Sequence, residues 1–144
     1  MTDEDYTTRK LAAELLGRLG HRSAIEPLIA ATTDASWEVR QAAFVALAAL
    51  FGNVPELLEH LPRALSDSNP AVRIEGVRLL SDTKQPEVLR LLESAVNDDN
   101  DLVKVEIAER LGQLGNKRGA VMLLEMADRS RTVHDNYLAS RTAN

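Results

Sequence analysis

Residues 34–50 read DASWEVRQAAFVALAAL: an acid, a hydroxyl residue, a lone Trp and a Val-Arg pair, followed by an almost uninterrupted apolar run. Such a stretch is compatible with a membrane segment, a catalytic helix with a placed Asp and Arg, or one unit of a repeat. Its longest apolar run, 42–51, is about half the ~20 residues that a membrane helix needs. We therefore expect no membrane span here.

The stretch is the second of four aligned copies. The acids that open the copies stand 31, 33 and 31 residues apart. In each copy a good helix N-cap stands two residues after the acid, and a cation stands six residues after it. The acids are Asp3, Asp34, Asp67 and Asp98, the caps are Asp5, Ser36, Asn69 and Asn100, and the cations are Arg9, Arg40, Arg73 and Lys104. Agreement at three positions in four copies is typical of a repeat protein.

Each copy has the period of a helical hairpin. Apolar residues follow the cap at the i, i+3, i+4, i+7 spacing, then come a turn and a second apolar-periodic segment. One hairpin cannot bury its apolar faces alone, whereas stacked hairpins share a continuous core. The pattern predicts one all-α domain over 1–144, a right-handed solenoid of four hairpins at about 3–33, 34–66, 67–97 and 98–127. A weaker fifth copy that opens at Asp128, with Ser130 at the cap position, predicts a C-terminal capping helix or partial repeat at 128–144.

The composition agrees with this prediction and excludes several classes of function. The chain is 44% hydrophobic but only 3% aromatic, and the abundance of Leu and Ala favours helices. A net charge of -5 argues against bulk attraction to nucleic acid or anionic membranes. The absence of Cys excludes disulfides and thiolate chemistry. Because the N-terminal residues are acidic and not apolar, we expect a cytoplasmic protein without a secretory signal.

The repeat resembles a known family. The Asp, the following Val-Arg pair and a segment such as AAELLGRLG (12–20) are similar to HEAT repeats, and in particular to the short HEAT-like repeats first described in phycobilin lyases. The resemblance covers roughly residues 3–128. It implies first helices on a convex side, second helices on a concave side, and a ladder of Asp–Arg contacts between adjacent repeats. The family includes scaffolds, adaptors, a few lyases and DNA-repair relatives, so it implies a fold more than a function.

The recurring acids and cations are interpreted as structural. A catalytic pair occurs once per site, whereas this pair recurs in every copy. An Asp is favoured near a helix N-terminus, and an Arg can hold both carboxylate oxygens. The resemblance thus assigns the ladder to Asp34, Arg40, Asp67, Arg73, Asp98 and Lys104. Because an ammonium group cannot make the two-pronged contact, Lys104 predicts looser coupling between repeats three and four.

We expect no enzyme active site, cofactor or metal. The three His residues share no metal-ligand spacing, and the chain has no Gly-rich phosphate loop and no lyase motif that the resemblance can transfer. For nucleic acid, the second helices and their leading turns carry six cations and six acids, which is no basic funnel. The cations are Arg22, Arg63, Lys84, Arg90, Lys117 and Arg118, and the acids are Glu26, Glu56, Glu59, Glu87, Glu93 and Glu125.

The remaining prediction is a scaffold or adaptor that binds a protein or peptide. By helical phase, Glu26, Glu59, Arg63 and Arg90 point outward from the second helices, either as a partner-binding row or as an ordinary solvated face. Trp37 stands at a position that the other copies do not reserve for an aromatic residue, so it is either an interface anchor or a lid over the neighbouring hairpin. Exposed solenoid ends would also permit end-to-end self-association. The alternative function is a nucleic-acid-binding protein or lyase-type enzyme on the same solenoid.

Overall fold

The computed structural model describes residues 3–52, 55–80 and 86–142, which form α-helices and no strand. The elements in chain order are α1 Asp3–Leu19, the short 3-10 helix η1 Arg22–Ala24, α2 Ile25–Ala31, α3 Trp37–Phe51, α4 Pro55–Leu65, α5 Pro70–Leu79, α6 Pro86–Ala95, α7 Asp101–Gln113 and α8 Lys117–Thr142.

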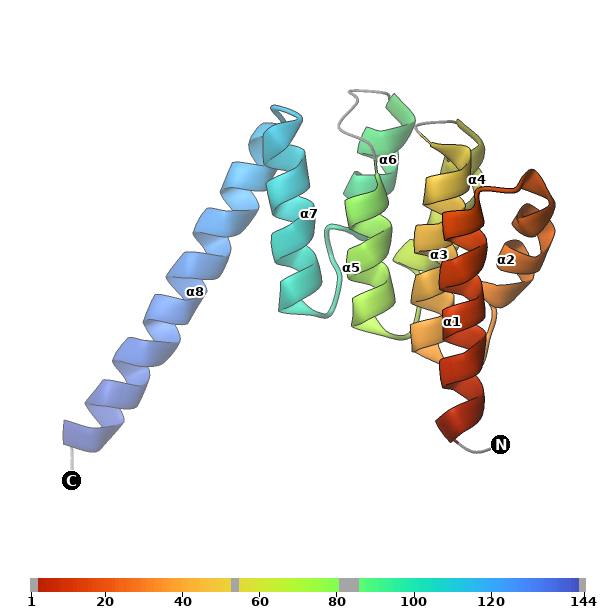
Figure 1. Cartoon of the computed structure of the whole chain (residues 1–144). Helices are drawn as coiled ribbons and strands as arrows, with labels where there is room; N and C mark the ends of the chain where they lie inside the picture. Colours follow the sequence, from red (N-terminus) through yellow and green to blue (C-terminus); the bar gives the residue numbers. More distant parts are fainter. Residues whose placement is uncertain (1–2, 53–54, 81–85, 143–144) are drawn as a thin grey trace.

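The helices form two layers (Figure 1). The first helices α1, α3, α5 and α7 lie side by side in one layer, and α2, α4 and α6 lie behind them. Each of these second helices packs on the first helix of the following repeat: α2 on α3, α4 on α5 and α6 on α7. Because every repeat covers part of the next one, the hairpins are joined into a single stack. The prediction of an all-α solenoid is confirmed.

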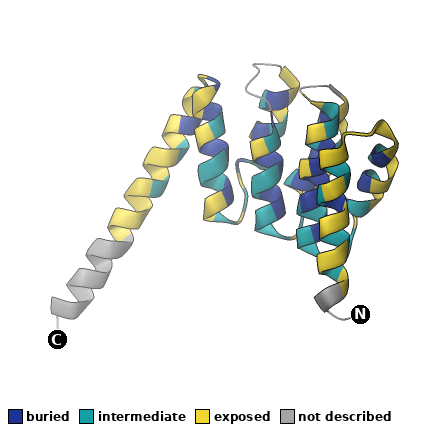
Figure 2. Cartoon of the chain, viewed as in Figure 1, coloured by how far each residue is buried: buried dark blue, intermediate teal, exposed yellow. Residues whose placement is uncertain are grey.

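The main core is a continuous apolar cluster to which every repeat contributes. Leu28, Leu47, Leu61 and Leu92 are fully buried within it, on α2, α3, α4 and α6. Burying one such side chain contributes roughly 1.5–3 kcal/mol. Figure 2 shows the buried positions gathered in the stack of α1 to α7, while most of the described length of α8 is exposed.

The predicted N-caps are realised in different ways. The side chain of Asn69 accepts from the N–H of Ala71, and the side chain of Asn100 accepts from the first N–H groups of α7. Ser36 occupies the N-cap position of α3, but its hydroxyl donates to Glu38 and caps no backbone N–H. The prediction for Asp5 is wrong: α1 begins at Asp3, so Asp5 lies inside the helix.

The predicted separate helix at 128–144 is replaced by a continuation of α8, which runs without a break from Lys117 to Thr142. The reason is local, since residues 120–142 contain neither Gly nor Pro to end the helix. The start of α8 packs along α7, and the rest leads away from the stack (Figure 1). Gly119 of α8 lets this helix lie close to α7, because a Cβ there would lie 2.4 Å from the carbonyl oxygen of Ala108.

Candidate functional site

Three bidentate Asp–Arg pairs join consecutive repeats. In the central pair, Arg40 donates from Nε to Oδ2 of Asp67 and from Nη2 to Oδ1, both over 2.7 Å. The two side chains are only 13% and 6% exposed. The pairs on either side repeat the geometry at 2.7 and 2.9 Å: they are Arg9 with Asp34 and Arg73 with Asp98. In every case the Arg of one repeat reaches forward to the Asp of the next.

The same Asp also shapes its own turn. Oδ1 of Asp67 accepts from the N–H of Asn69 over 2.8 Å, and the equivalent bonds at Asp34 and Asp98 have the same length. Each inner Arg also reaches back: Nη1 of Arg40 donates to the carbonyl oxygen of Asp34 over 2.8 Å. One guanidinium therefore connects the turn before its own helix with the equivalent turn of the next repeat.

This environment keeps the pairs charged. The fork of Arg9 lowers the pKa of Asp34. Burial by itself raises the pKa of Asp67 and of Asp98, but the guanidinium forks and the backbone N–H bonds outweigh it, so both pKa values are also lowered. The carboxylates correspondingly raise the pKa of the paired arginines. Groups this firmly ionised and paired suit coupling between repeats better than proton transfer.

The predicted weak junction between repeats three and four is wrong. That junction is held by Arg73, which contacts Asp98 through two bonds and Asp99 through a third of 2.6 Å. Because each Arg reaches forward, Lys104 would serve the junction after repeat four. Its Nζ instead donates to Asp101 of its own helix over 2.8 Å.

Within the described residues, we find no group of three or more His, Cys, Asp or Glu side chains that could hold a metal. His60 stacks on Phe51 with ring centroids 5.8 Å apart, a packing role that accounts for its position. The part of the chain that the structure describes also contains no helix long and apolar enough to span a membrane. The side chains of His134 and Lys84 lie outside the described residues.

An exposed charged row crosses the second helices. Glu26, Glu59 and Arg90 each stand eight residues before the Asp of the next repeat, on α2, α4 and α6, and all three are exposed. Glu59 lies midway between Leu57 and Leu61, both buried, so it points away from the core. The row therefore presents two acids followed by one cation at equivalent positions of three repeats.

Arg63 is also exposed, one turn beyond Glu59 on α4. Its Nη1 donates to Oγ1 of Thr32 over 3.1 Å, so this guanidinium also links α4 to the turn that follows α2. Arg90 approaches Glu87 at 3.9 Å on the surface, a contact too long and too exposed to hold it in place. Both cations are thus available to a partner, Arg63 at the cost of one hydrogen bond.

Trp37 packs partly buried against a small cluster of Phe44, Ala64 and Val72. Ala64 and Val72 belong to α4 and α5, so the indole covers a contact between its own repeat and the next. A partner would meet only the exposed part of the ring.

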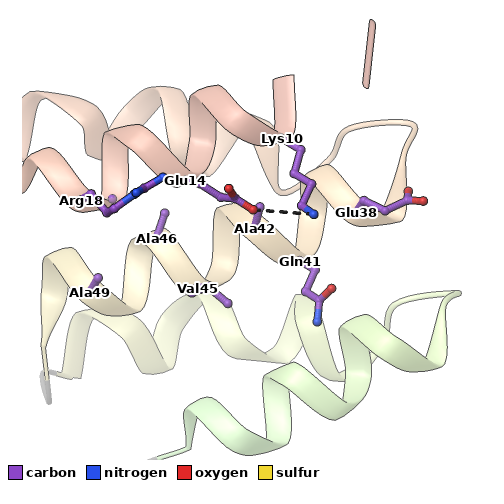
Figure 3. A pocket seen from close by; sticks show the side chains of 10 residues that line it. Lys10, Glu14, Arg18, Glu38, Gln41, Ala42, Val45, Ala46 and Ala49 are labelled. Atoms are coloured by element: carbon purple, nitrogen blue, oxygen red, sulfur yellow. Dashed lines mark ion pairs between the residues drawn. The ribbon is translucent and has the colours of Figure 1, made fainter. Parts of the chain in front are cut away.

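The structure also contains a groove that the sequence did not predict. It has a volume of about 500 Å³ and lies between α1 and α3, with Gly17, Ala42, Ala46 and Ala49 among its lining residues. Figure 3 shows the charged and polar rim: Lys10, Glu14 and Arg18 come from α1, and Glu38 and Gln41 come from α3. Lys10 and Glu14 approach each other at 3.7 Å. The sequence signal is a set of small residues on two neighbouring helices, visible only once their pairing is known.

The comparisons with known proteins agree with the repeat geometry. The family model for HEAT repeats matches residues 1–65 and 58–134, nearly the whole chain. The chain is also 32% identical over 130 residues to a protein of Pseudanabaena tenuis (strain PCC 7409) named "Uncharacterized phycocyanin operon protein Z". That match covers 85% of this chain and 64% of the relative, so the chain spans somewhat less than two thirds of the relative's length.

Proposed function

Because the chain belongs to the HEAT-repeat family, we propose that it is a non-enzymatic, cytoplasmic interaction module that binds a protein or peptide across its second helices. The observation that carries this proposal is the row of Glu26, Glu59 and Arg90, exposed at the same position of three successive repeats. Stacked repeats present such side chains in register, as an extended partner requires.

The order of charges along the row specifies the partner. Packed helices lie about 8–10 Å apart, so a segment that crosses α2, α4 and α6 meets a new row residue every few residues of its length. It meets Glu26 and Glu59 first, and then Arg90. The complementary partner has Lys or Arg over α2 and α4 and an acid over α6. Arg63, beside Glu59, favours a second acid in the partner near α4.

The charge balance supports a protein partner over nucleic acid. A nucleic-acid-binding face needs an excess of cations to neutralise phosphates, whereas two of the three row residues are acids. The net charge of -5 acts in the same direction. For the lyase-type alternative, the Asp–Arg site supplies no acid or base for catalysis, since its central Asp and Arg side chains are engaged with each other.

A displayed peptide library tests the proposal. Peptides are selected on the wild-type chain and compared on a variant with Glu59→Lys and Arg90→Glu, which reverses two row charges and leaves the net charge unchanged. The control variant carries Glu109→Lys and Arg131→Glu, two exposed residues outside the row.

We expect the wild type and the control to select peptides with basic residues toward one end and acidic residues toward the other. The row variant should lose those peptides by at least tenfold and select the opposite order of charges. Equal binding of the same peptides by the row variant and the wild type would exclude this surface. The same variants then serve for capture of the natural partner from the native host.

A further inference from the structure

The turns that follow α2, α4 and α6 are joined by two equal steps. Arg40 donates to the carbonyl oxygen of Asp34 in the first turn over 2.8 Å, and to the carboxylate of Asp67 in the second turn over 2.7 Å. Arg73 makes the same two contacts at the same distances, from Asp67 to Asp98 in the third turn. Each step is therefore spanned by one guanidinium with a hydrogen bond on either side.

The charged row takes its spacing from these steps. Glu26, Glu59 and Arg90 each stand eight residues before the Asp of the following turn. Their helices are neighbours, since α4 contacts α6 and Arg63 of α4 donates to Thr32 at the end of α2 over 3.1 Å. Helices packed side by side lie about 8–10 Å apart. A peptide that crosses the row must therefore present a matching side chain about every 8–10 Å, on one of its faces.

The polyproline II conformation meets this condition. It has three residues per turn and rises about 3.1 Å per residue, so every third side chain lies on the same face, about 9.3 Å from the last. In a β-strand the third residue lies on the opposite face, and residues of one face recur about every 6.7 Å. An α-helix returns to the same face after seven residues, about 10.5 Å, and is itself about 10–12 Å wide.

The row residues are available for such contacts. All three are exposed. Among the described residues, Glu26 and Glu59 make no ion pair, and Arg90 makes only the long surface contact of 3.9 Å with Glu87. A partner therefore does not have to break a buried pair to reach them.

We propose that the row binds a polyproline II segment whose basic residues meet Glu26 and Glu59 and whose acid meets Arg90, each three positions from the next. This inference rests on the function proposed above and adds the conformation and the spacing of the partner. The three-residue period is the same in either direction of the peptide. Prolines between the charged positions fix this conformation in the free peptide, so less conformational entropy is lost on binding.

Synthetic peptides of one composition test the spacing. Lys-Pro-Pro-Lys-Pro-Pro-Glu and its reverse sequence carry a charge at every third position, whereas Lys-Pro-Lys-Pro-Glu-Pro-Pro and its reverse carry one at every second position. Fluorescence anisotropy at low salt, where surface charges are least screened, measures the affinities. We expect the better peptide of the first pair to bind about tenfold more tightly than either peptide of the second. Glycine in place of its prolines should weaken binding about threefold or more, because a flexible peptide loses more freedom.

Variants of the chain separate this inference from the proposed function. The variant with Glu59→Lys and Arg90→Glu should lose the wild-type peptide and bind Lys-Pro-Pro-Glu-Pro-Pro-Lys, which complements the reversed charges. The control with Glu109→Lys and Arg131→Glu should bind like wild type.

Two kinds of result contradict the inference. Equal affinity for the two spacings overturns the polyproline II assignment, as does tighter binding of the glycine peptide or of a helical peptide with charges seven residues apart. If the row variant still loses these peptides, the row remains the binding site. If no peptide binds, or the row variant binds the same peptides as wild type, the proposed function fails together with the inference.

Discussion

At the scale of the residue, the arginine of each of the two inner pairs, Arg40 and Arg73, has two tasks that no other side chain in the repeat can combine. Arg40 holds both oxygens of Asp67 and at the same time donates to the carbonyl of Asp34. These contacts use three of its nitrogens, two directed at one carboxylate and the third at a carbonyl oxygen. A planar group with five donors meets this requirement, whereas an ammonium on a flexible stem does not.

Arg40→Ala should lower the free energy of unfolding by about 3 kcal/mol, because it leaves the carboxylate of Asp67 buried without its partner. Arg40→Lys should lie between this variant and wild type. Urea unfolding followed by circular dichroism measures both. Arg131→Ala, which removes an exposed pair with Asp128, serves as the control and should change stability by less than about 0.5 kcal/mol. An unchanged unfolding midpoint in Arg40→Ala would refute the coupling role.

The paired aspartates also predict a response to acid. The pKa values of Asp34, Asp67 and Asp98 are lowered in the folded chain, relative to an unfolded value of about 3.9. The unfolded chain therefore binds more protons as the pH falls through this range, so the stabilisation is complete above about pH 5 and is lost progressively below about pH 4. Unfolding midpoints measured from pH 6 to pH 2 test this. Asp67→Asn should be less stable at neutral pH and should show a shallower decline in acid.

At the scale of the element, close approach of helices decides where small residues are required. Gly17 of α1 faces Ala46 of α3, and there is no room for a further methyl group between them. Gly112 of α7 occupies the corresponding position of the last repeat, 95 residues later, but has nothing within 4 Å of an added Cβ. The same residue type is thus a packing requirement in one helix and only a conformational cost in the other.

Replacing each of the two glycines by alanine should change the stability of the chain in opposite directions. Gly17→Ala should destabilise the chain by about 1–3 kcal/mol, because the added methyl pushes α1 away from α3. Gly112→Ala should stabilise it by up to about 1 kcal/mol, since alanine favours the helix and meets open space. Thermal unfolding of both variants beside wild type checks the pair. Stabilisation by Gly17→Ala would show that α1 and α3 can separate freely, and destabilisation by Gly112→Ala would contradict the open space at that position.

At the scale of the whole molecule, the proposed partner row and the Asp–Arg pairs occupy different helices of the stack. The row runs across α2, α4 and α6, whereas the paired arginines lie on α1, α3 and α5. Reversing charges of the row therefore leaves the contacts between repeats in place.

Partner binding and stability should therefore separate in experiment. The variant with Glu59→Lys and Arg90→Glu should lose the selected peptide and keep the unfolding midpoint of wild type, because both side chains are exposed. Titration calorimetry and urea unfolding measure the two quantities side by side. A lowered unfolding midpoint in this variant would show that the row charges also hold the stack together.

Much of this architecture follows from local sequence. The 31- to 33-residue spacing, the helical period and the Asn caps depend on residues within one or two turns of each other, and they are enough to predict hairpins that must stack to bury their apolar faces. The same spacing places Glu26, Glu59 and Arg90 at one position of three repeats. These predictions need no knowledge of which helix touches which.

Only the tertiary structure decided the rest. The direction of the Arg73 fork, the packing of Trp37 against the cluster of Phe44, Ala64 and Val72, and the groove between α1 and α3 depend on residues that are distant in the chain. The fifth copy retains the Asp and Ser of a repeat, yet α8 continues through it, because neither Gly nor Pro interrupts the helix. Leu11 and Ala42 hold the same place in their repeats, but Ala42 is buried beside the groove between α1 and α3, whereas Leu11 is half exposed. The sequence by itself determined the repeat and its helices; packing between repeats decided which of the equivalent faces are buried and which are left for a partner.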